Sequence, residues 1–243
     1  MPPLFTTWRE NLLALAFPPR CVGCECDLRD EAVGLAALCS VCREDLTIYA
    51  GPQCHKCGAP VVFAGATECP HCAGDFWKFE TTFALGQYDG LLRHLVLQAK
   101  KVLHEDAARA LGDLIVEVRG ESLLEWRPTH NMAVPMHWGR RLWRQTNSPE
   151  VIGERIARGL GIPALSRALS RKRYTARQAL SAPSVRRRNL RKAFAVRGNL
   201  TGARVLLVDD VLTTGATAHS CAAALKDAGA EAVAVAVAAR SFT

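Results

Sequence analysis

The stretch that decides the fold is VLLVDDVLTTGAT, at residues 205–217. Its first four residues are apolar without a break, which is typical of a parallel strand buried on both faces. Two adjacent acids, Asp209 and Asp210, follow at the carboxyl end of that strand, where open α/β sheets bind ligands. The small, hydroxyl-rich segment behind them predicts a loop that opens a helix and holds a phosphate with free backbone N–H groups. The stretch therefore predicts a sugar-phosphate site in an α/β protein.

Apolar segments on both sides of this stretch predict the rest of the sheet and its helices. Strands are expected at residues 132–136, 163–169, 193–196 and 232–239, and an edge strand or hairpin at residues 76–88. Helical spacing of apolar residues predicts helices at residues 91–99 and 107–118. Cys221 falls on the apolar face of the helix that follows residue 217, so we expect it to be a small core residue.

A second anion site is expected where the segment HWGRRLWRQTN, at residues 137–147, runs into a helix. Ser148 is a good N-cap, Pro149 suits the first helical position, and Gly161 is expected to end the helix. A helix N-terminus behind three arginines favours an anionic ligand.

The chain has 243 residues, enough for one α/β domain and a small accessory module. No apolar run approaches the ~18 residues of a membrane span. A short apolar run at residues 12–17 follows a single basic residue, so we interpret it as part of an amphipathic helix rather than a signal peptide, and we expect a cytoplasmic protein. The expected organisation is an N-terminal helix at 1–19, a cysteine-rich module at 20–75, a connecting strand and helices at 76–130, and an α/β domain at 131–243.

Four Cys-x-x-Cys pairs lie between residues 21 and 72. Ten cysteines in a cytoplasmic protein suggest metal rather than disulfides, and two pairs complete a tetrahedral zinc site with four thiolates. Sequential pairing is simplest, and interleaved pairing is left open. We interpret Cys26 as a spare thiol, and His55 and His71 as exposed residues rather than ligands. Two structural Zn²⁺ sites are expected, one from Cys21, Cys24, Cys39 and Cys42, the other from Cys54, Cys57, Cys69 and Cys72.

The net charge of +8 comes from one part of the chain. Residues 164–200 hold eleven Arg or Lys and no acid, so the remainder carries a net charge of −3. The cysteine-rich segment, at residues 20–75, has four basic and eight acidic residues, and each four-thiolate zinc site adds a net −2. Because a nucleic-acid surface should be positive, this charge favours a structural or protein-contact role for the module.

Lys100 and Lys101 lie at the end of the helix expected at residues 91–99. A place in a phosphate site is one interpretation of this pair. From the residues alone, we prefer a solvated lysine pair that is favoured by the helix dipole.

The stretch at residues 205–217 resembles the signature with which type I phosphoribosyltransferases bind 5-phosphoribosyl-1-pyrophosphate (PRPP). Its TTGAT segment argues against a response-regulator receiver, and no GxxxxGK[ST] P-loop is present. The whole chain is similar to the competence protein ComF family, which joins a cysteine-rich zinc module to a phosphoribosyltransferase-like domain. The resemblance also rests on the Cys pairs, Tyr88-Asp89-Gly90 with Lys100, Val134-Pro135-Met136-His137, Arg140-Arg141, Arg144 with Asn147, Gln178, Arg187-Arg188-Asn189-Leu190 and Ala193-Phe194.

The resemblance implies an α/β fold class, with a small N-terminal zinc-ribbon module before a type I phosphoribosyltransferase-like, Rossmann-like parallel-sheet domain. It implies that Asp209 and Asp210 accept hydrogen bonds from the ribose hydroxyls, that they are the candidates for any catalytic role, and that Mg²⁺ accompanies the pyrophosphate. The 5′-phosphate would be held by Thr213, Thr214, Gly215, Ala216 and Thr217. The pyrophosphate loop and a mobile lid would draw on Lys100, Met136, His137, Arg140, Arg144, Arg171 and Arg173.

This chain departs from the family pattern in the pyrophosphate loop. Where the family typically reads RGFNQ, residues 144–148 read RQTNS, so Gln145 replaces a glycine that permits close backbone approach. Lys100 is likewise followed by Lys101 rather than by an aromatic residue. PRPP binding is therefore expected more strongly than phosphoribosyl transfer. Any hood that selects an acceptor is expected to come from residues 76–88 or from the zinc module.

Two classes of function follow. The first is a PRPP-binding phosphoribosyltransferase linked to natural transformation and DNA uptake, which also handles single-stranded DNA. The alternative is a non-catalytic, PRPP-responsive adaptor that binds a helicase or another protein partner. In the first, DNA would stack on tryptophans interleaved with arginines, although ordinary core packing also explains those tryptophans. The DNA-binding candidates are Trp138, Arg141, Trp143, Arg186, Arg187 and Arg188.

Overall fold

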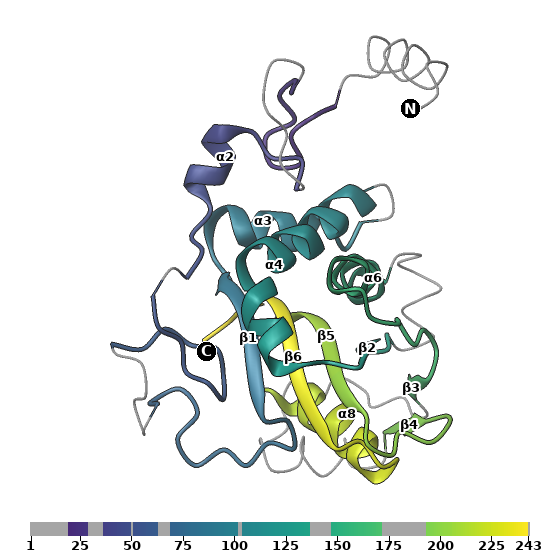
Figure 1. Ribbon diagram of the computed structural model, residues 1–243. Helices are drawn as coiled ribbons and strands as arrows, with labels where there is room; N and C mark the ends of the chain where they lie inside the picture. Colours follow the sequence, from purple (N-terminus) through teal and green to yellow (C-terminus); the bar gives the residue numbers. More distant parts are fainter. Residues whose placement is uncertain are drawn as a thin grey trace, which may run out of the picture.

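The computed structural model describes residues 19–28, 36–49, 51–62, 69–101, 104–136, 147–171 and 193–242 (Figure 1). The N-terminal helix expected at residues 1–19 lies almost entirely outside the described residues. In chain order, the elements are α2 (Ser40–Asp45), β1 (Thr81–Gln87), α3 (Gly90–Gln98), α4 (Glu105–Trp126), β2 (His130–Ala133), α6 (Ser148–Leu160), β3 (Leu169–Arg171), β4 (Phe194–Val196), β5 (Arg204–Leu212), α8 (Ala216–Asp227) and β6 (Ala232–Arg240). Within this part of the chain, no helix combines the length and the apolar composition needed to cross a membrane.

The central sheet has four parallel strands in the order β1-β6-β5-β2. The opening stretch forms β5, which pairs with β6 on one side and β2 on the other, so the predicted parallel strand is confirmed. All nine residues of β6 are buried. The strand predicted within residues 76–88 is β1, and it lies at an edge of the sheet as expected.

Helices cover both faces of this sheet, which explains why its strands are apolar without alternation. Leu206 and Val208 of β5 pack toward α3, α4 and α6, whereas Val205 and Leu207 pack toward α8. Cys221 lies on the buried face of α8 and is part of the core, as expected. Figure 1 shows α3, α4 and α6 together on one side of the sheet and α8 on the other. A bidentate ion pair between Arg155 and Asp113, with both distances at 2.8 Å, holds α6 against α4.

The strand predicted at residues 163–169 is wrong. Only Ala164 pairs with the central sheet there, in an isolated parallel bridge with Asn131 of the edge strand β2. Pro163 has no N–H to donate, and Arg167 turns the chain away with a φ of 69°. Leu169 then begins β3, which pairs with β4 in a separate antiparallel sheet of two strands.

The cysteine-rich module covers the exposed edge of β1. Ile48 forms a bridge with Gly86, and the N–H groups of Tyr49 and Thr82 donate to the carbonyls of Leu85 and His55, respectively. An uncovered edge strand invites pairing with other chains, so this module also protects the sheet.

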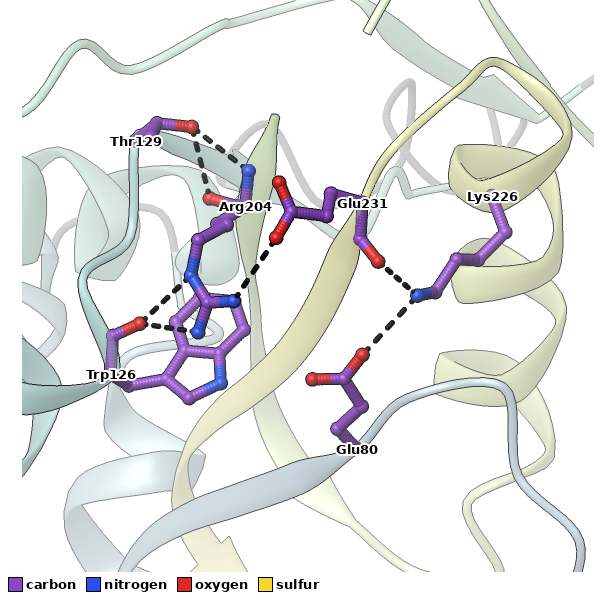
Figure 2. A network of polar contacts seen from close by, with 6 residues as sticks. All are labelled: Glu80, Trp126, Thr129, Arg204, Lys226 and Glu231. Carbon is purple, nitrogen blue, oxygen red and sulfur yellow. Dashed lines mark hydrogen bonds and ion pairs between the residues drawn. The ribbon is translucent and has the colours of Figure 1, made fainter. Parts of the chain in front are cut away.

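A polar network ties the elements together at the amino end of the strands (Figure 2). Arg204, at the start of β5, donates to the carbonyl of Trp126 at 2.6 and 3.0 Å and lies 4.5 Å over its ring. Lys226, near the end of α8, pairs with Glu80 at 3.2 Å and donates to the carbonyl of Glu231. These contacts fix the edge of the sheet opposite to the two acids.

Candidate functional site

We call residues 213–215, which join β5 to α8 within the segment expected to hold a phosphate, the phosphate loop. They follow the carboxyl end of β5. The strand continues through both acids to Leu212, which corrects the expectation that it ends before them. The pairing between β5 and β6 continues past the acids, since Asp209 lies opposite Val237 and Leu212 lies opposite Arg240. The loop then turns at Gly215 into α8, whose first N–H groups lack partners within the helix. Thr213 and Thr214 are exposed, and the Thr214 hydroxyl accepts from the N–H of Ala216 at 3.5 Å.

The two acids lie on opposite sides of β5, because successive side chains in a strand alternate. Asp210 lies on the side of α3 and α6, where Ser148 Oγ donates to its Oδ2 at 3.4 Å. Asp209 lies on the side of α8, and its carboxylate accepts from the N–H of Asp210 at 2.9 Å. Burial and the adjacent charge of Asp210 raise the pKa of Asp209 to about 8, although the Asp210 N–H and Lys100 act in the opposite direction. In the ligand-free protein, Asp209 is therefore largely protonated near neutral pH.

Lys100 is brought to the same site from the end of α3. Its Nζ lies 3.0 Å from Asp210 Oδ2, and both side chains are mostly buried. The preference for a solvated lysine pair is therefore wrong for Lys100, although Lys101 is exposed. The cause is topological: β1 runs parallel to β5, so the segment that follows β1 reaches the same edge of the sheet as the acids. The spacing of apolar residues in the sequence does not indicate where Lys100 lies relative to the acids.

Arg240 is a site residue that the sequence reasoning missed. It ends β6, is only 4% exposed, and donates from Nη1 to the carbonyl of Leu212 at 2.8 Å and to that of Thr213. Arg240 thus binds the backbone where β5 ends and the phosphate loop begins. The available signal was an arginine directly after a run of eight alanines and valines, at residues 232–239.

Trp77 is a second missed residue, on the other side of the loop. Gly215, the N-cap of α8, has a φ of 72°, and a Cβ placed on it would lie 2.8 Å from Cε2 of the Trp77 ring. The neighbouring N–H of Lys78 donates to His219 Nδ1 at 3.2 Å. Residues 76–79 therefore lie along the start of α8, within the segment from which a hood was expected.

The helix behind the expected pyrophosphate loop begins one residue earlier than predicted. Asn147, not Ser148, is the N-cap of α6, because the buried Ser148 side chain turns inward to Asp210. Pro149 is therefore the second helical residue rather than the first, whereas Gly161 ends the helix as predicted. Met136 and Asn147 border a cavity of about 260 Å³ between β2, α6 and β3, which Arg171 also lines.

Most of the residues expected in the lid and at the DNA lie outside the described residues. The structure therefore gives no position for His137, Trp138, Arg140, Arg141, Trp143, Arg144, Gln145, Arg173, Arg186, Arg187 and Arg188.

The cysteine pairs come together in two groups, in sequential order. Cys54, Cys57, Cys69 and Cys72 form one group, with Sγ–Sγ distances of 3.6 Å for Cys57–Cys69 and 3.8 Å for Cys54–Cys72. Four sulfurs placed tetrahedrally at ~2.3 Å from zinc are about 3.8 Å apart, so this group fits Zn²⁺. His55 and His71 are both exposed, as expected.

The other group contains a fifth thiol. The sulfurs of Cys21, Cys24, Cys26 and Cys39 all lie within 4.8 Å of one another, and Cys42 lies beside them, hydrogen-bonded to Cys21 and Cys39. Cys26 is therefore part of the thiol group rather than remote from it. Burial opposes ionisation of Cys21, but N–H groups that include those of Cys39 and Gly23 lower its pKa to about 6. Four sulfurs this close to one another fit the ligand set of one Zn²⁺.

We expect two zinc ions per chain in the native protein and one in Cys57→Ser, because the second group would lose a thiolate that is wholly buried. Metal analysis of purified protein measures this. Cys221→Ala, which changes a core thiol far from both groups, should retain two zinc ions. Two ions in Cys57→Ser would contradict the assignment of that thiol.

The class of protein follows from this fold and from two matching families. Residues 150–241 match the phosphoribosyl transferase domain, and residues 12–73 match the double zinc ribbon domain. The chain thus joins two zinc-ribbon sites to a type I phosphoribosyltransferase-like parallel-sheet domain, which confirms the expected fold class.

The relatives identify the family. The chain is 31% identical over 230 residues to the DNA utilization protein YhgH of Escherichia coli (strain K12), a match that covers 91% of this chain and 96% of the relative. It is 26% identical over 223 residues to competence protein F of Haemophilus influenzae, covering 89% and 94%, respectively. This protein belongs to the ComF/YhgH family, as the resemblance implied.

One solved structure is also similar in sequence. The glutamine PRPP amidotransferase of B. subtilis, complexed with ADP and GMP, is 26% identical over 44% of this chain and 22% of its own. At a TM-score of 0.32, this likeness adds no weight to the assignment.

Proposed function

We propose that this protein binds PRPP at the carboxyl edge of β5 and acts in DNA uptake or utilization. The observation that carries the proposal is the convergence of three elements at this edge: the acids of β5, Lys100 from the end of α3, and the N-terminus of α8. The relatives' names, a DNA utilization protein and a competence protein, supply the biological context.

Each part of PRPP has a partner of matching chemistry. Asp209 and Asp210 are hydrogen-bond acceptors for the ribose hydroxyls, and the phosphate loop offers amides and hydroxyls to the 5′-phosphate. The Lys100–Asp210 pair would open when a hydroxyl reaches Asp210, and this would free the Lys100 ammonium for the pyrophosphate. Lys100 would thus pair with Asp210 in the empty site and bind the pyrophosphate in the filled site.

Mg²⁺ would bind with the pyrophosphate, where it neutralises charge and orients the phosphates. It prefers oxygen ligands, and the partly exposed carboxylate of Asp210 fits that preference. The protein's own contribution is positional: a rigid sheet edge, a fixed helix N-terminus and a lysine held ready by Asp210.

Zn²⁺ would be held by Cys54, Cys57, Cys69 and Cys72 at one site and by four of the five thiols at the other. We propose sequential pairing and a structural role at both sites, since four thiolates leave no open position on zinc.

The non-catalytic adaptor is a second candidate, favoured by one observation. Among the described residues, the most exposed large apolar side chains all lie between residues 41 and 76: Val41 at 72%, Val62 at 95% and Phe76 at 89%. Because contiguous exposed apolar patches mark protein-contact surfaces, we propose these three side chains as candidates for a partner contact. A helicase or another protein of DNA uptake could bind there while PRPP occupies β5. Single-stranded DNA remains a proposed ligand of the arginine- and tryptophan-rich segments.

Calorimetry with PRPP and Mg²⁺ tests the proposal, and its pH dependence identifies the site. Because the pKa of Asp209 is raised to about 8, a ligand that prefers the carboxylate must release a proton when it binds below that pH. Affinity for PRPP should therefore rise as pH increases from 7 to 8, by up to ~10-fold per unit, and level off above the pKa. The 5′-phosphate itself ionises near pH ~6, below this window.

Asp209→Asn is the matched control, since it cannot titrate and should show a flat profile between pH 7 and 9. Ribose 5-phosphate, which lacks the pyrophosphate, should bind more weakly than PRPP. An absence of heat with wild-type protein at pH 8.5 would rule out the proposed ligand.

A further inference from the structure

We propose that the second zinc site, formed by Cys54, Cys57, Cys69 and Cys72, braces the phosphate loop, and that Trp77 and Arg240 are the positioning residues through which it acts. This inference rests on the proposed function, because it concerns how the loop is kept ready for a phosphate. Each of the two Cys-x-x-Cys turns reaches one end of the loop.

The first connection runs from the turn at residues 54–57 through Trp77. The Trp77 ring packs against the cysteines of the second zinc site. Lys56 Nζ lies 5.8 Å from the centroid of the ring. On its other side the ring contacts Gly215, leaving no room for a Cβ there. Phe79 stacks on Trp77 at 4.9 Å and is itself buried in the core beneath α8. Trp77 therefore lies wedged between a zinc turn and the N-terminus of α8.

The second connection runs from the turn at residues 69–72 through Phe242. Phe242 packs against the same thiol group, and its ring lies 4.2 Å from that of His71. The guanidinium carbon of Arg240 lies 4.9 Å from the centroid of the Phe242 ring. Arg240 Nη1 then holds the carbonyls of Leu212 and Thr213. The two connections thus converge on the two ends of one short loop.

Arg240 also places a positive charge beside the loop. It is 4% exposed, and within the described residues it forms no ion pair with a carboxylate. Its Nε is buried without a hydrogen-bond partner in this part of the chain. A buried cation that is compensated by carbonyl dipoles and the Phe242 ring, without a carboxylate among the described residues, is costly in the empty protein, and a phosphate dianion nearby would relieve that cost. Arg240 is therefore suited both to shaping the loop and to favouring an anion in it.

Zinc gives this arrangement its rigidity. One ion closes both turns onto four thiolates, so it fixes the position of Trp77 relative to Phe242 and hence the two ends of the loop. Loss of that ion should loosen the loop without removing any group that touches PRPP. The first thiol group packs with α3 and α4 instead, so loss of its ion should leave the loop unchanged.

The experiment compares the two zinc sites directly. Cys57→Ser and Cys24→Ser/Cys26→Ser should each retain one zinc ion, because the double variant leaves only three of the five thiols of the first group. Calorimetry measures their affinity for PRPP and for inorganic phosphate. We expect Cys57→Ser to lose roughly 10- to 100-fold in affinity for both ligands, and Cys24→Ser/Cys26→Ser to remain within about 3-fold of wild type. Hydrogen exchange at residues 212–217 should become faster in Cys57→Ser alone. Equal affinity and equal exchange in the two variants would overturn the proposal.

Variants of the two positioning residues form the second part of the experiment, because they should keep both zinc ions. They test whether the phosphate loop depends on Trp77 and Arg240 even if Cys57→Ser fails to fold. Arg240→Met and Trp77→Ala should bind two zinc ions and lose about 10-fold or more in phosphate affinity, whereas Arg240→Lys should recover part of it. Wild-type affinity in both Arg240→Met and Trp77→Ala would overturn the proposal. If wild-type protein binds no PRPP, the proposed function fails by itself, and faster exchange of the loop in Cys57→Ser still decides whether the site braces it.

Discussion

Replacing both acids, in Asp209→Asn/Asp210→Asn, is expected to reduce affinity for PRPP by about 10²- to 10⁴-fold and to leave the fold intact. Each carboxylate is proposed to accept a hydrogen bond from a ribose hydroxyl, and a hydrogen bond to a charged group contributes ~1.5–3 kcal/mol. The asparagines keep the size of the side chains but lose the charge. Calorimetry at pH 8.5, where Asp209 is mostly ionised, gives the largest contrast.

The stability of this variant should not fall with its affinity. Because burial raises the pKa of Asp209 above its unfolded value, the folded state binds the proton more tightly between pH ~4 and ~8, and ionisation of this carboxyl costs stability as pH rises. Removal of the charge should therefore maintain or raise the melting temperature at pH 8. Loss of the partly exposed Lys100–Asp210 pair offsets this only slightly.

Glu80→Gln/Glu231→Gln is the matched control. It removes the same two charges, but at the amino end of the strands, in the network of Figure 2. It should bind PRPP like wild type, since the effect depends on position rather than on net charge. If the double asparagine variant binds PRPP within about 3-fold of this control, the acids are not at the ligand.

The parts of the site that local sequence determines were predictable. A continuous apolar run specifies a strand covered on both faces, and Leu206 and Leu207 do pack on opposite sides of the sheet. A Cys-x-x-Cys turn points two sulfurs at one ion whatever surrounds it. The acids lie near the carboxyl end of the same strand, so the segment that carries the strand carries the site as well.

The parts that depend on distant segments could not be predicted in this way. Lys100, Trp77 and Arg240 come from three separate segments. The parallel order β1-β6-β5 brings Lys100 and Arg240 to the same edge, whereas Trp77 precedes β1 and reaches the loop along the start of α8. The same limit explains the error at residues 163–169. Their composition is typical of a strand, but pairing there stops after Ala164, because the next residues turn away from β2.

The contact between Gly215 and Trp77 leads to the second large effect. Gly215→Ala is expected to lower affinity for PRPP by about 100-fold or more, for two reasons that add. A φ of 72° costs a non-glycine residue roughly 1–2 kcal/mol, and the new Cβ would lie within 3.0 Å of three atoms of the Trp77 ring. Either the ring or the start of α8 must move, and the phosphate loop lies directly at that junction.

Gly202→Ala separates the two causes. Gly202 has a φ of 74°, nearly the same as Gly215, but no atom lies within 4 Å of its Cβ position. Both variants should therefore share the cost of the backbone conformation in thermal unfolding, while only Gly215→Ala should lose PRPP. If the two variants bind PRPP equally, the tryptophan does not constrain the loop.

A double-mutant cycle with Trp77→Phe completes the argument, because the smaller ring leaves room for the Cβ while keeping an aromatic contact. In that background, Gly215→Ala should cost less affinity than it does in wild type, and a coupling of about 0.5–3 kcal/mol is typical of residues in contact. Additive losses would mean that the ring and the loop act independently. A positive coupling would place the constraint at this contact, between the phosphate loop and a ring that packs against the second zinc site.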